Sequence, residues 1–248
     1  MRTRRSSIDI QESIASLKGY PDDLALARKV AADHPAVIAV LADFVARRPH
    51  LAALAPTLLR VNAALVRCYD RQGTLFLCGN GGSYADSLHI AGELLKSFEK
   101  DRSLTPAQKE KFAGLPDGDA LAEHLEQGLR AYALGNSGPL ATAVQNDNKL
   151  RDIHYAQDLY AMARPGDVVL GISTSGNAKN VLYAIQVGKA LGLTTIGMTG
   201  EKGGRLAEIV DIPIKAPGTV TKYVQEEHFP IYHTICAMIE AYYFPKPR

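Results

Sequence analysis

The first seventy residues show the apolar spacing of amphipathic helices. Through segment 56–73, apolar side chains recur every three or four positions, so they share one face of a helix that closes at Gly73. Segment 21–33 begins with a proline followed by two aspartates, all favourable in a first helical turn. These patterns predict an N-terminal helical extension over residues 1–72.

From Thr74 onward, short apolar runs alternate with longer helical segments. This alternation is typical of βαβ units on a parallel sheet that is covered on both faces. Residues 73–248 are therefore predicted to form one α/β domain, a three-layer doubly wound parallel sheet with flavodoxin-like, nucleotide-binding topology. The expected strands are 74–78, 130–135, 167–173, 194–200 and 211–216.

Composition narrows the class of protein only a little. Of 248 residues, 46% are hydrophobic and the formal net charge is +2, so a sizeable core is expected and neither nucleic acid nor membrane is indicated as a partner. No apolar stretch was expected to reach the roughly 20 residues of a membrane helix. Three widely spaced cysteines indicate reduced thiols and a cytoplasmic protein.

A glycine-rich turn follows the first expected strand. Three of the four residues 79–82 are glycine, and Ser83 comes next. Glycines let the main chain approach a ligand closely, and a helix that starts at Ser83 would direct free N–H groups at it. The spacing fits neither the dinucleotide fingerprint nor the P-loop. A tight turn without any ligand is the alternative interpretation.

A second turn, Ser173-Thr174-Ser175-Gly176-Asn177, follows another expected strand. Its three hydroxyls, its backbone N–H groups and the dipole of the next helix all favour a bound phosphate. An ordinary serine or threonine helix cap would explain only one of the three hydroxyls. Ligands of open parallel sheets bind at the carboxyl ends of strands, where both turns are expected to lie.

Ionisable side chains occur on two of the expected helices. His89 and Glu93 are four residues apart, so they share a helix face. Glu93 has apolar neighbours, and a buried carboxylate needs a partner or a raised pKa, either of which suits a general base. Gln225, His228 and His233 interrupt the pattern of the C-terminal helix. The simpler interpretation of His228 is a satisfied core histidine.

These motifs come in the order seen in sugar isomerase (SIS) domain proteins, and the chain resembles their phosphoheptose isomerase branch. The resemblance rests on CGNGGS, H-x-x-x-E, GISTSGN, TGEKGGRLAE and VQEEHFPIYH, and it extends over roughly residues 50–244. It implies the SIS fold and an aldose–ketose isomerase that converts sedoheptulose 7-phosphate to D-glycero-D-manno-heptose 7-phosphate. The expected chemistry is acid/base proton transfer through an enediol(ate).

The same resemblance assigns roles to individual residues. Glu93 and His233 are the expected acid/base pair. The expected substrate-binding residues are Asn80, Gly81, Gly82, Ser83, Asp147, Ser173, Thr174, Ser175 and Gln225. One zinc ion per site is expected, and its ligands would be His89, Glu93, Gln225 and His233.

The spacing of two of these ligands raises a geometric difficulty. Gln225 and His233 lie about 12 Å apart along a straight helix, a long separation for two ligands of one metal. Pro230 between them should distort the helix. The family resemblance implies a homotetramer with active sites between subunits, and a second copy would remove the difficulty.

The chain departs from the family pattern at three places. Ala178 stands where the family often has another phosphate-binding serine, and Lys222 stands where an aspartate near the substrate is usual. The polar insertion after Glu93 is also longer than in compact members. These departures leave open an isomerase for a related phosphosugar.

Two further hypotheses come from other functional classes. A non-catalytic SIS protein that binds a phosphosugar or a partner protein would not need Glu93 and His233 together, and this chain has both. A DNA-binding head in the N-terminal helices would need a basic recognition helix. The basic residues there are too scattered for one and favour a solvated face.

Overall fold

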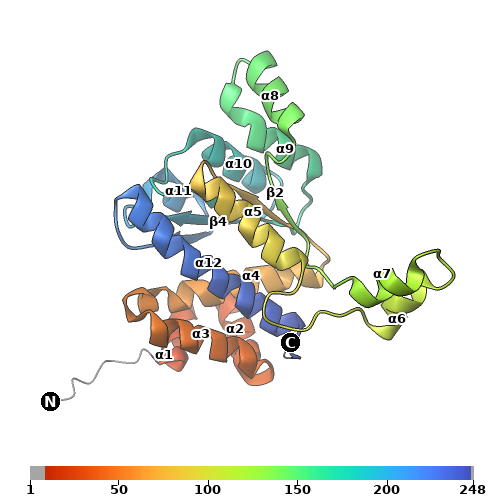
Figure 1. Ribbon diagram of the computed structural model, residues 1–248. Helices are drawn as coiled ribbons and strands as arrows, with labels where there is room; N and C mark the ends of the chain where they lie inside the picture. The colour runs from red at the N-terminus through yellow and green to blue at the C-terminus, as the bar shows by residue number, and fades with distance from the viewer. Residues whose placement is uncertain (1–8, 247–248) are drawn as a thin grey trace.

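The computed structural model describes residues 9–246, and its centre is a five-stranded parallel sheet (Figure 1). The strand order is β2-β1-β3-β4-β5, and each neighbouring pair is parallel. This order is the flavodoxin-like one, so the predicted fold class is confirmed. The strands are β1 (Leu75–Cys78), β2 (Ala131–Ala133), β3 (Val168–Ile172), β4 (Thr194–Thr199) and β5 (Ile212–Lys215).

Residues that follow one another along a strand pack into two separate cores. Leu75 and Leu77 of β1 lie in one core, whereas Phe76 and Cys78 lie in the other. The first core includes α4 (Ala55–Asp70), α5 (Gly82–Leu95) and α12 (Thr221–Tyr243). The second includes α9 (His154–Met162), α10 (Lys179–Ala190) and α11 (Gly204–Ile209). Every residue of the central strands β1 and β3 is buried, because both faces of the sheet are covered.

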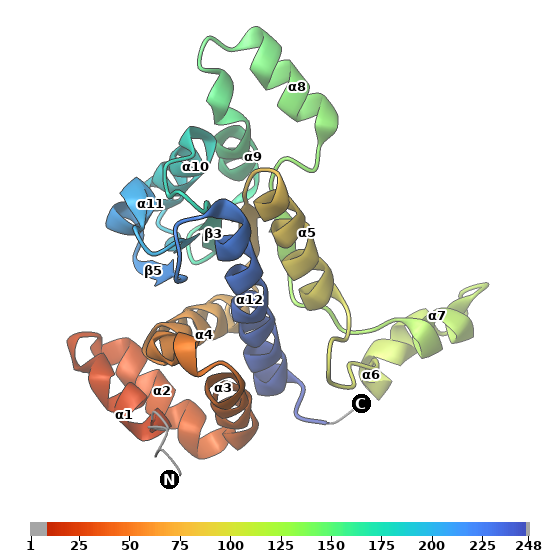
Figure 2. The ribbon, with the colours of Figure 1, turned by 60° about the vertical axis from the view of Figure 1, so that its left-hand side comes forward.

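The N-terminal helices share the first core with the sheet. They pack against α4 and α12 on the side away from the strands (Figure 2). Their bounds are α1 (Ile10–Ala15), η1 (Ser16–Gly19), α2 (Pro21–Asp33), α3 (Pro35–Arg47) and η2 (Pro49–Leu54). Residues 1–8 of the predicted extension lie outside the described residues.

Contrary to the sequence expectation, one helical stretch is long and apolar enough to cross a membrane. This stretch is Pro49–Asp70, which comprises η2 and α4. In the fold, 67% of its most apolar window is buried inside the protein. Such burial is typical of a helix in a protein core.

Two helical segments project from this body (Figure 1). The polar insertion forms α6 (Pro106–Lys109), η3 (Glu110–Phe112) and α7 (Gly118–His124). The second projection is α8 (Gly138–Asp147), which leads through η4 (Arg151–Ile153) into α9. Neither α8 nor α9 was predicted from the sequence.

The C-terminal helix α12 is continuous, even though it contains Pro230. The Thr234 hydroxyl donates a hydrogen bond of 2.8 Å to the Pro230 carbonyl. Pro230 therefore does not end the helix, and Gln225 and His233 remain on one element.

A buried ion pair joins the C-terminal end of α5 to α12. The side chains of Arg102 and Glu240 are both 0% exposed, and Arg102 Nε donates to Glu240 Oε1 over 2.7 Å. Arg102 also donates to the Leu94 carbonyl at the end of α5. The Glu240 carboxylate accepts from three successive backbone N–H groups, those of residues 98–100. The free carbonyl end of α5 is thus satisfied by a group that α12 holds.

We expect Arg102→Met to destabilise the fold strongly, because it leaves the Glu240 carboxylate buried without its cation. Loss of one partner of a buried pair costs about 3–5 kcal/mol of unfolding free energy. Urea unfolding measures this loss. Lys109→Met is the matched control, since it removes the exposed Lys109–Glu123 pair and should change stability little. Equal stability of the two variants would contradict this account.

Candidate active site

The two predicted ligand turns lie at the carboxyl ends of β1 and β3, which are neighbours in the sheet. The chain leaves these two strands in opposite directions along the sheet, and ligands of such folds bind at this switch point. The Asn80 and Asn180 side chains pair across the turns through two hydrogen bonds of 2.9 and 2.8 Å. This amide pair ties the β1 turn to the first turn of α10.

The β1 turn needs its glycines for backbone conformation and for close packing. Gly81 has a φ of 55°, which favours glycine. A Cβ on Gly82 would come within 2.5 Å of Gln225 Nε2, and one on Gly79 would come within 2.5 Å of the Ser83 carbonyl oxygen. The Tyr155 hydroxyl, from α9, donates to the Gly79 carbonyl. The turn is therefore held from both sides.

The helix after this turn differs in one detail from the sequence prediction. It begins at Gly82 rather than at Ser83. The Ser83 and Tyr84 N–H groups donate to the Asn80 and Gly81 carbonyls within the turn. They are therefore not free to bind a ligand as predicted, and the buried Ser83 side chain is the remaining candidate donor there.

The hydroxyls of the β3 turn differ in exposure. Ser173 is buried, Thr174 is half-buried and Ser175 is exposed. The Ser175 hydroxyl oxygen accepts from the Asn177 N–H over 3.2 Å, which leaves its own proton available to a ligand. Ala178 caps α10 and has no side-chain acceptor, so no cap hydroxyl competes there with an anion.

Close packing against the loop after β4 fixes the shape of the β3 turn. Gly176 has a φ of 67°, and a Cβ there would overlap the carbonyl oxygen of Gly203. The Leu206 N–H donates to the Gly176 carbonyl over 2.9 Å. The hydroxyls before Gly176 are therefore presented by a rigid turn.

The predicted acid/base pair lies where α5 packs against α12. His89 Nε2 is 3.1 Å from Glu93 Oε1 on α5. The imidazole rings of His89 and His233 are 5.0 Å apart, centroid to centroid, with their planes nearly perpendicular. Burial and His89 lower the pKa of His233, and the Glu93 carboxylate is close enough to act on the same imidazole in the opposite direction. The tertiary fold thus brings together a carboxylate and an imidazole that are 140 residues apart in the chain.

Two atoms of this pair have unused hydrogen-bonding capacity. Within residues 9–246, Glu93 Oε2 and His233 Nε2 are buried and have no hydrogen-bond partner. Lys96 Nζ lies 3.6 Å from Glu93 Oε2, at ion-pair distance. Burial, together with the nearby His89, lowers the pKa of His233, so its imidazole is neutral near neutral pH. Buried polar atoms normally have partners, and a substrate would supply them here.

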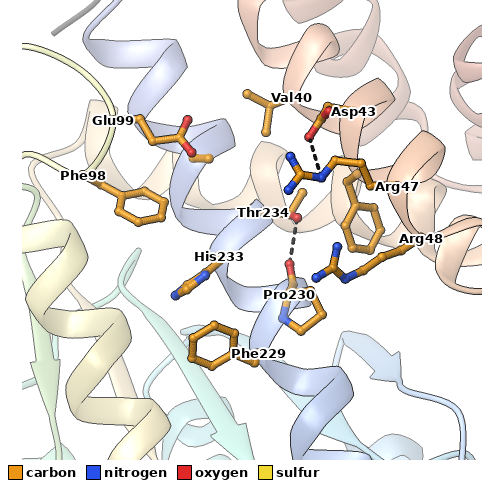
Figure 3. Close-up of a pocket in the computed structure, with 12 residues that line it drawn as sticks. Val40, Asp43, Arg47, Arg48, Phe98, Glu99, Phe229, Pro230, His233 and Thr234 are labelled. Atoms are coloured by element: carbon orange, nitrogen blue, oxygen red, sulfur yellow. Dashed lines mark hydrogen bonds and ion pairs between the residues drawn. The ribbon is translucent and has the colours of Figure 1, made fainter.

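A pocket of about 210 Å³ opens beside His233 (Figure 3). Phe229 and Phe98 pack against the His233 ring, with centroids 4.2 and 5.4 Å away. Arg47 and Arg48 enter the pocket from the end of α3, and Arg47 pairs with Asp43. The His233 ring, predicted to be catalytic, therefore lines this pocket.

Two predicted residues are not beside this pair. The side chain of Gln225 lies next to Gly82, at the start of α5. Asp147 is exposed at the end of α8, which projects from the body, and its carboxylate accepts a hydrogen bond from Asn146. Within one chain, neither residue contacts the Glu93–His233 pair through any bond that the structure shows for residues 9–246.

The predicted zinc ligands do not form a complete set within one chain. His89, Glu93 and His233 are close together, but His89 Nε2 is already paired with Glu93. Over the described part of the chain, no three His, Cys, Asp or Glu side chains are grouped so that they could hold a metal ion. The free Glu93 Oε2 and His233 Nε2 are donor atoms of a suitable kind, but the residues of a single chain do not fit the four-ligand site.

The sequence analysis missed several residues of this region. Tyr232, whose hydroxyl is 3.0 Å from His89 Nδ1, was missed because it lies among apolar residues at helical spacing, where an aromatic side chain is expected in the core. Tyr155 was missed because α9 was not predicted, and Asn180 because nothing in the sequence pairs it with Asn80. His228 is fully buried and its Nε2 bonds to the Thr199 carbonyl over 3.2 Å, as a core histidine would. Its Nδ1 has no hydrogen-bond partner within residues 9–246, so the predicted satisfied histidine is satisfied at one nitrogen only.

Comparisons with known proteins show which family the chain resembles in sequence. The SIS domain family matches residues 120–200. The phosphoheptose isomerase of Geotalea daltonii is 37% identical over 195 residues, which cover 79% of this chain and 88% of that protein. Phosphoheptose isomerase 2 of Campylobacter jejuni is 36% identical and is 81% covered.

Solved structures lead to the same family. The phosphoheptose isomerase structure from Francisella tularensis has a TM-score of 0.63 and 26% identity, with 86% of this chain and 96% of that chain covered. The structure from Neisseria gonorrhoeae has a TM-score of 0.61 and 26% identity, with 86% and 99% covered. The fold and the site define an SIS-domain sugar isomerase. Within that class, the chain belongs to the phosphoheptose isomerase family.

We expect Gly176→Ala to weaken phosphosugar binding and to destabilise the fold, because a Cβ cannot fit beside Gly203. Gly192→Ala is the matched control. Gly192 also has a positive φ, 75°, but nothing lies within 4 Å of a Cβ placed there. The control should lose about 1–2 kcal/mol of unfolding free energy from backbone strain alone and keep its affinity. Urea unfolding and ligand titration measure both quantities; equal effects in the two variants would contradict this account.

Proposed function

We propose that the protein isomerises sedoheptulose 7-phosphate to D-glycero-D-manno-heptose 7-phosphate, a step that feeds the synthesis of activated heptose. The single observation that carries this proposal is the meeting of Glu93 and His233 at the junction of α5 and α12. A non-catalytic phosphosugar-binding protein would not need that pair. A cytoplasmic location is part of the proposal and agrees with three free, buried cysteines.

Glu93 is the proposed base for the carbon-bound proton. Its Oε1 is held by His89, so Oε2 is the oxygen left to act. Oε2 removes a proton from C1 of the ketose, and the electron pair of the C–H bond forms the C1=C2 bond of an enediolate. The same carboxyl then returns the proton to C2, which yields the aldose.

His233 is the proposed shuttle for the hydroxyl proton. As charge develops on O2, the imidazole donates a proton to that oxygen and takes one from the hydroxyl on C1. A neutral imidazole can serve as both donor and acceptor, and burial keeps His233 neutral by lowering its pKa. Each well-placed acid or base contributes roughly 10²–10⁴ in rate.

The two turns at the switch point are the proposed phosphate site. Ser173, Thr174 and Ser175 offer hydroxyl donors next to the start of α10, whose dipole favours an anion. Lys179 is the first residue of that helix, directly after the Ala178 that replaces the usual serine. Ser83 adds a hydroxyl from the β1 turn, and Asn80 and Asp147 are proposed to contact the sugar.

We propose that each active site is shared between copies in a homotetramer. Ser83 and Glu93 lie about 15 Å apart along α5, whereas C2 and the phosphorus of an extended heptose 7-phosphate are only roughly 9 Å apart at bond lengths of about 1.5 Å. If one copy supplied the phosphate turns and another supplied Glu93 and His233, the distance from the phosphate site to the base could match the length of the substrate. In a tetramer, the exposed Asp147 could also contact the substrate that is bound in the site of a neighbouring copy.

We propose that zinc binds only to the assembled tetramer. Zinc held by His89, Glu93, Gln225 and His233 would polarise the substrate carbonyl. One chain does not form that site, and the proton transfers by Glu93 and His233 need no metal ion. The test is conversion of sedoheptulose 7-phosphate to the aldose, with and without a chelator, together with metal analysis. Absence of aldose under both conditions would refute the isomerase proposal.

We expect Glu93→Gln to abolish turnover and to leave phosphosugar affinity largely intact, because the amide keeps the shape of the side chain but cannot take a proton. Glu123→Gln, on the projecting α7, is the matched control and should keep wild-type turnover. Steady-state kinetics and ligand titration provide the comparison. Unchanged turnover in the Glu93 variant would remove this residue from the mechanism.

Mixing two inactive variants tests the shared site. Glu93→Gln lacks the base, and Ser175→Asp places a repelling carboxylate in the phosphate turn. If Glu93 and Ser175 of one active site come from different copies, some sites in mixed tetramers should contain the wild-type form of both residues. Co-expression of the two variants should then restore part of the activity. Size-exclusion chromatography checks that mixed tetramers form. Mixed tetramers without any activity, or an active monomer, would contradict the proposal.

A further inference from the structure

Two asparagine side chains form a closed ring of hydrogen bonds between the proposed ligand turns. Asn80 lies in the glycine turn after β1, and Asn180 lies in the first turn of α10, just after the turn that follows β3. Asn80 Nδ2 donates to Asn180 Oδ1 over 2.9 Å, and Asn180 Nδ2 donates to Asn80 Oδ1 over 2.8 Å. Each amide therefore uses both its nitrogen and its oxygen on the other.

A backbone N–H group fixes the direction of both bonds. The Val181 N–H donates to the side chain of Asn180 over 3.0 Å. Because a backbone N–H can only donate, the atom that it meets must be the amide oxygen of Asn180. Asn180 then turns its nitrogen toward Asn80, which has to answer with its own oxygen. In the described chain the Asn80 amide has no hydrogen-bond partner on its own turn, so α10 sets its orientation.

The paired Asn80 amide can still bind a sugar hydroxyl. A side-chain amide has two N–H donors and two oxygen lone pairs, and the pair uses one of each. One N–H and one lone pair of Asn80 remain, and a hydroxyl can accept from the first or donate to the second. Asn80 is exposed, so a ligand can reach both groups. Asn180 offers less, because it is half-buried and its oxygen already accepts two bonds.

We propose that Asn180 is a positioning residue, which holds the Asn80 amide in the orientation that binds the sugar. This inference rests on the proposed function, in which Asn80 contacts the sugar and the hydroxyls of residues 173–175 contact the phosphate. Asn180 follows that phosphate turn on α10, so its bonds to Asn80 also fix the distance between the phosphate site and the sugar-binding amide. Without Asn180, the Asn80 amide is free to turn over and exchange its donor and acceptor.

The first test compares two ligands of Asn180→Ala by isothermal titration. We expect the ratio of affinities for sedoheptulose 7-phosphate and inorganic phosphate to fall about three- to ten-fold, the loss of one neutral hydrogen bond. Affinity for inorganic phosphate itself should stay near the wild-type value, because that ion reaches only the phosphate turn. An unchanged ratio would overturn the proposal. So would an equal loss for both ligands, since the amide pair would then only shape the phosphate turn.

Gln186→Ala is the matched control for this measurement. Gln186 is on the same helix, and its side-chain amide donates to the Leu182 carbonyl over 3.3 Å, about two turns beyond Asn180. The control should keep the wild-type ratio of affinities. A fall equal to that of Asn180→Ala would contradict a specific role of Asn180.

The second test is a double-mutant cycle with Asn80→Ala. If Asn180 acts through Asn80, Asn180→Ala should not lower the ratio further in the Asn80→Ala background. Additive effects would overturn the proposal, and so would a wild-type ratio in Asn80→Ala.

Asn180→Asp is a second variant for the case in which Asn180→Ala does not fold. Its carboxylate still accepts from Val181 and from Asn80 Nδ2, but it cannot donate to Asn80 Oδ1. The added charge repels the phosphate of both ligands, so the ratio isolates the sugar contact. We expect that ratio to fall, and a wild-type ratio would contradict the proposal.

These titrations separate the inference from the proposed reaction. If the wild-type protein binds sedoheptulose 7-phosphate without isomerising it, the reaction is refuted, and a ratio that falls in Asn180→Ala still supports the role of Asn180. If the protein isomerises the sugar and the ratio stays unchanged in that variant, only the inference about Asn180 fails.

Discussion

The packing of α5 against α12 is the contact on which the rest of the site depends. Glu93 is on the first of these helices and His233 is on the second. The buried Arg102–Glu240 pair joins the end of α5 to α12, and it satisfies backbone groups that would otherwise be left without partners. Such a network tolerates little displacement, because a buried charge without its partner is costly. The proposed acid/base pair therefore has a rigid support.

The same two helices connect the chemistry to the sheet. α5 starts in the glycine turn after β1, where Gly82 contacts Gln225 of α12. The other proposed phosphate turn follows β3, the next strand in the sheet. The proposed phosphate turns and the proposed acid/base pair thus lie at different points of these two packed helices and the sheet. Their separation along α5 is what makes a site shared between copies the favoured arrangement.

The Tyr232 hydroxyl extends this scaffold to single atoms. Tyr232 of α12 lies 3.0 Å from His89 of α5, and His89 is in turn paired with Glu93 on the same helix. The sequence indicated Glu93 and His233 through a known family pattern. It could not indicate Tyr232, because an aromatic residue at helical spacing is usually part of a core.

By itself, the sequence determined the strands, the long helices and the two ligand turns, since these follow from local apolar periodicity and from residues with special backbone or hydroxyl chemistry. It also indicated the isomerase family. Only the tertiary structure decided that α12 continues through Pro230, that Gln225 lies beside Gly82 and that Asp147 projects away. These features depend on contacts between residues far apart in the chain, which local patterns do not encode.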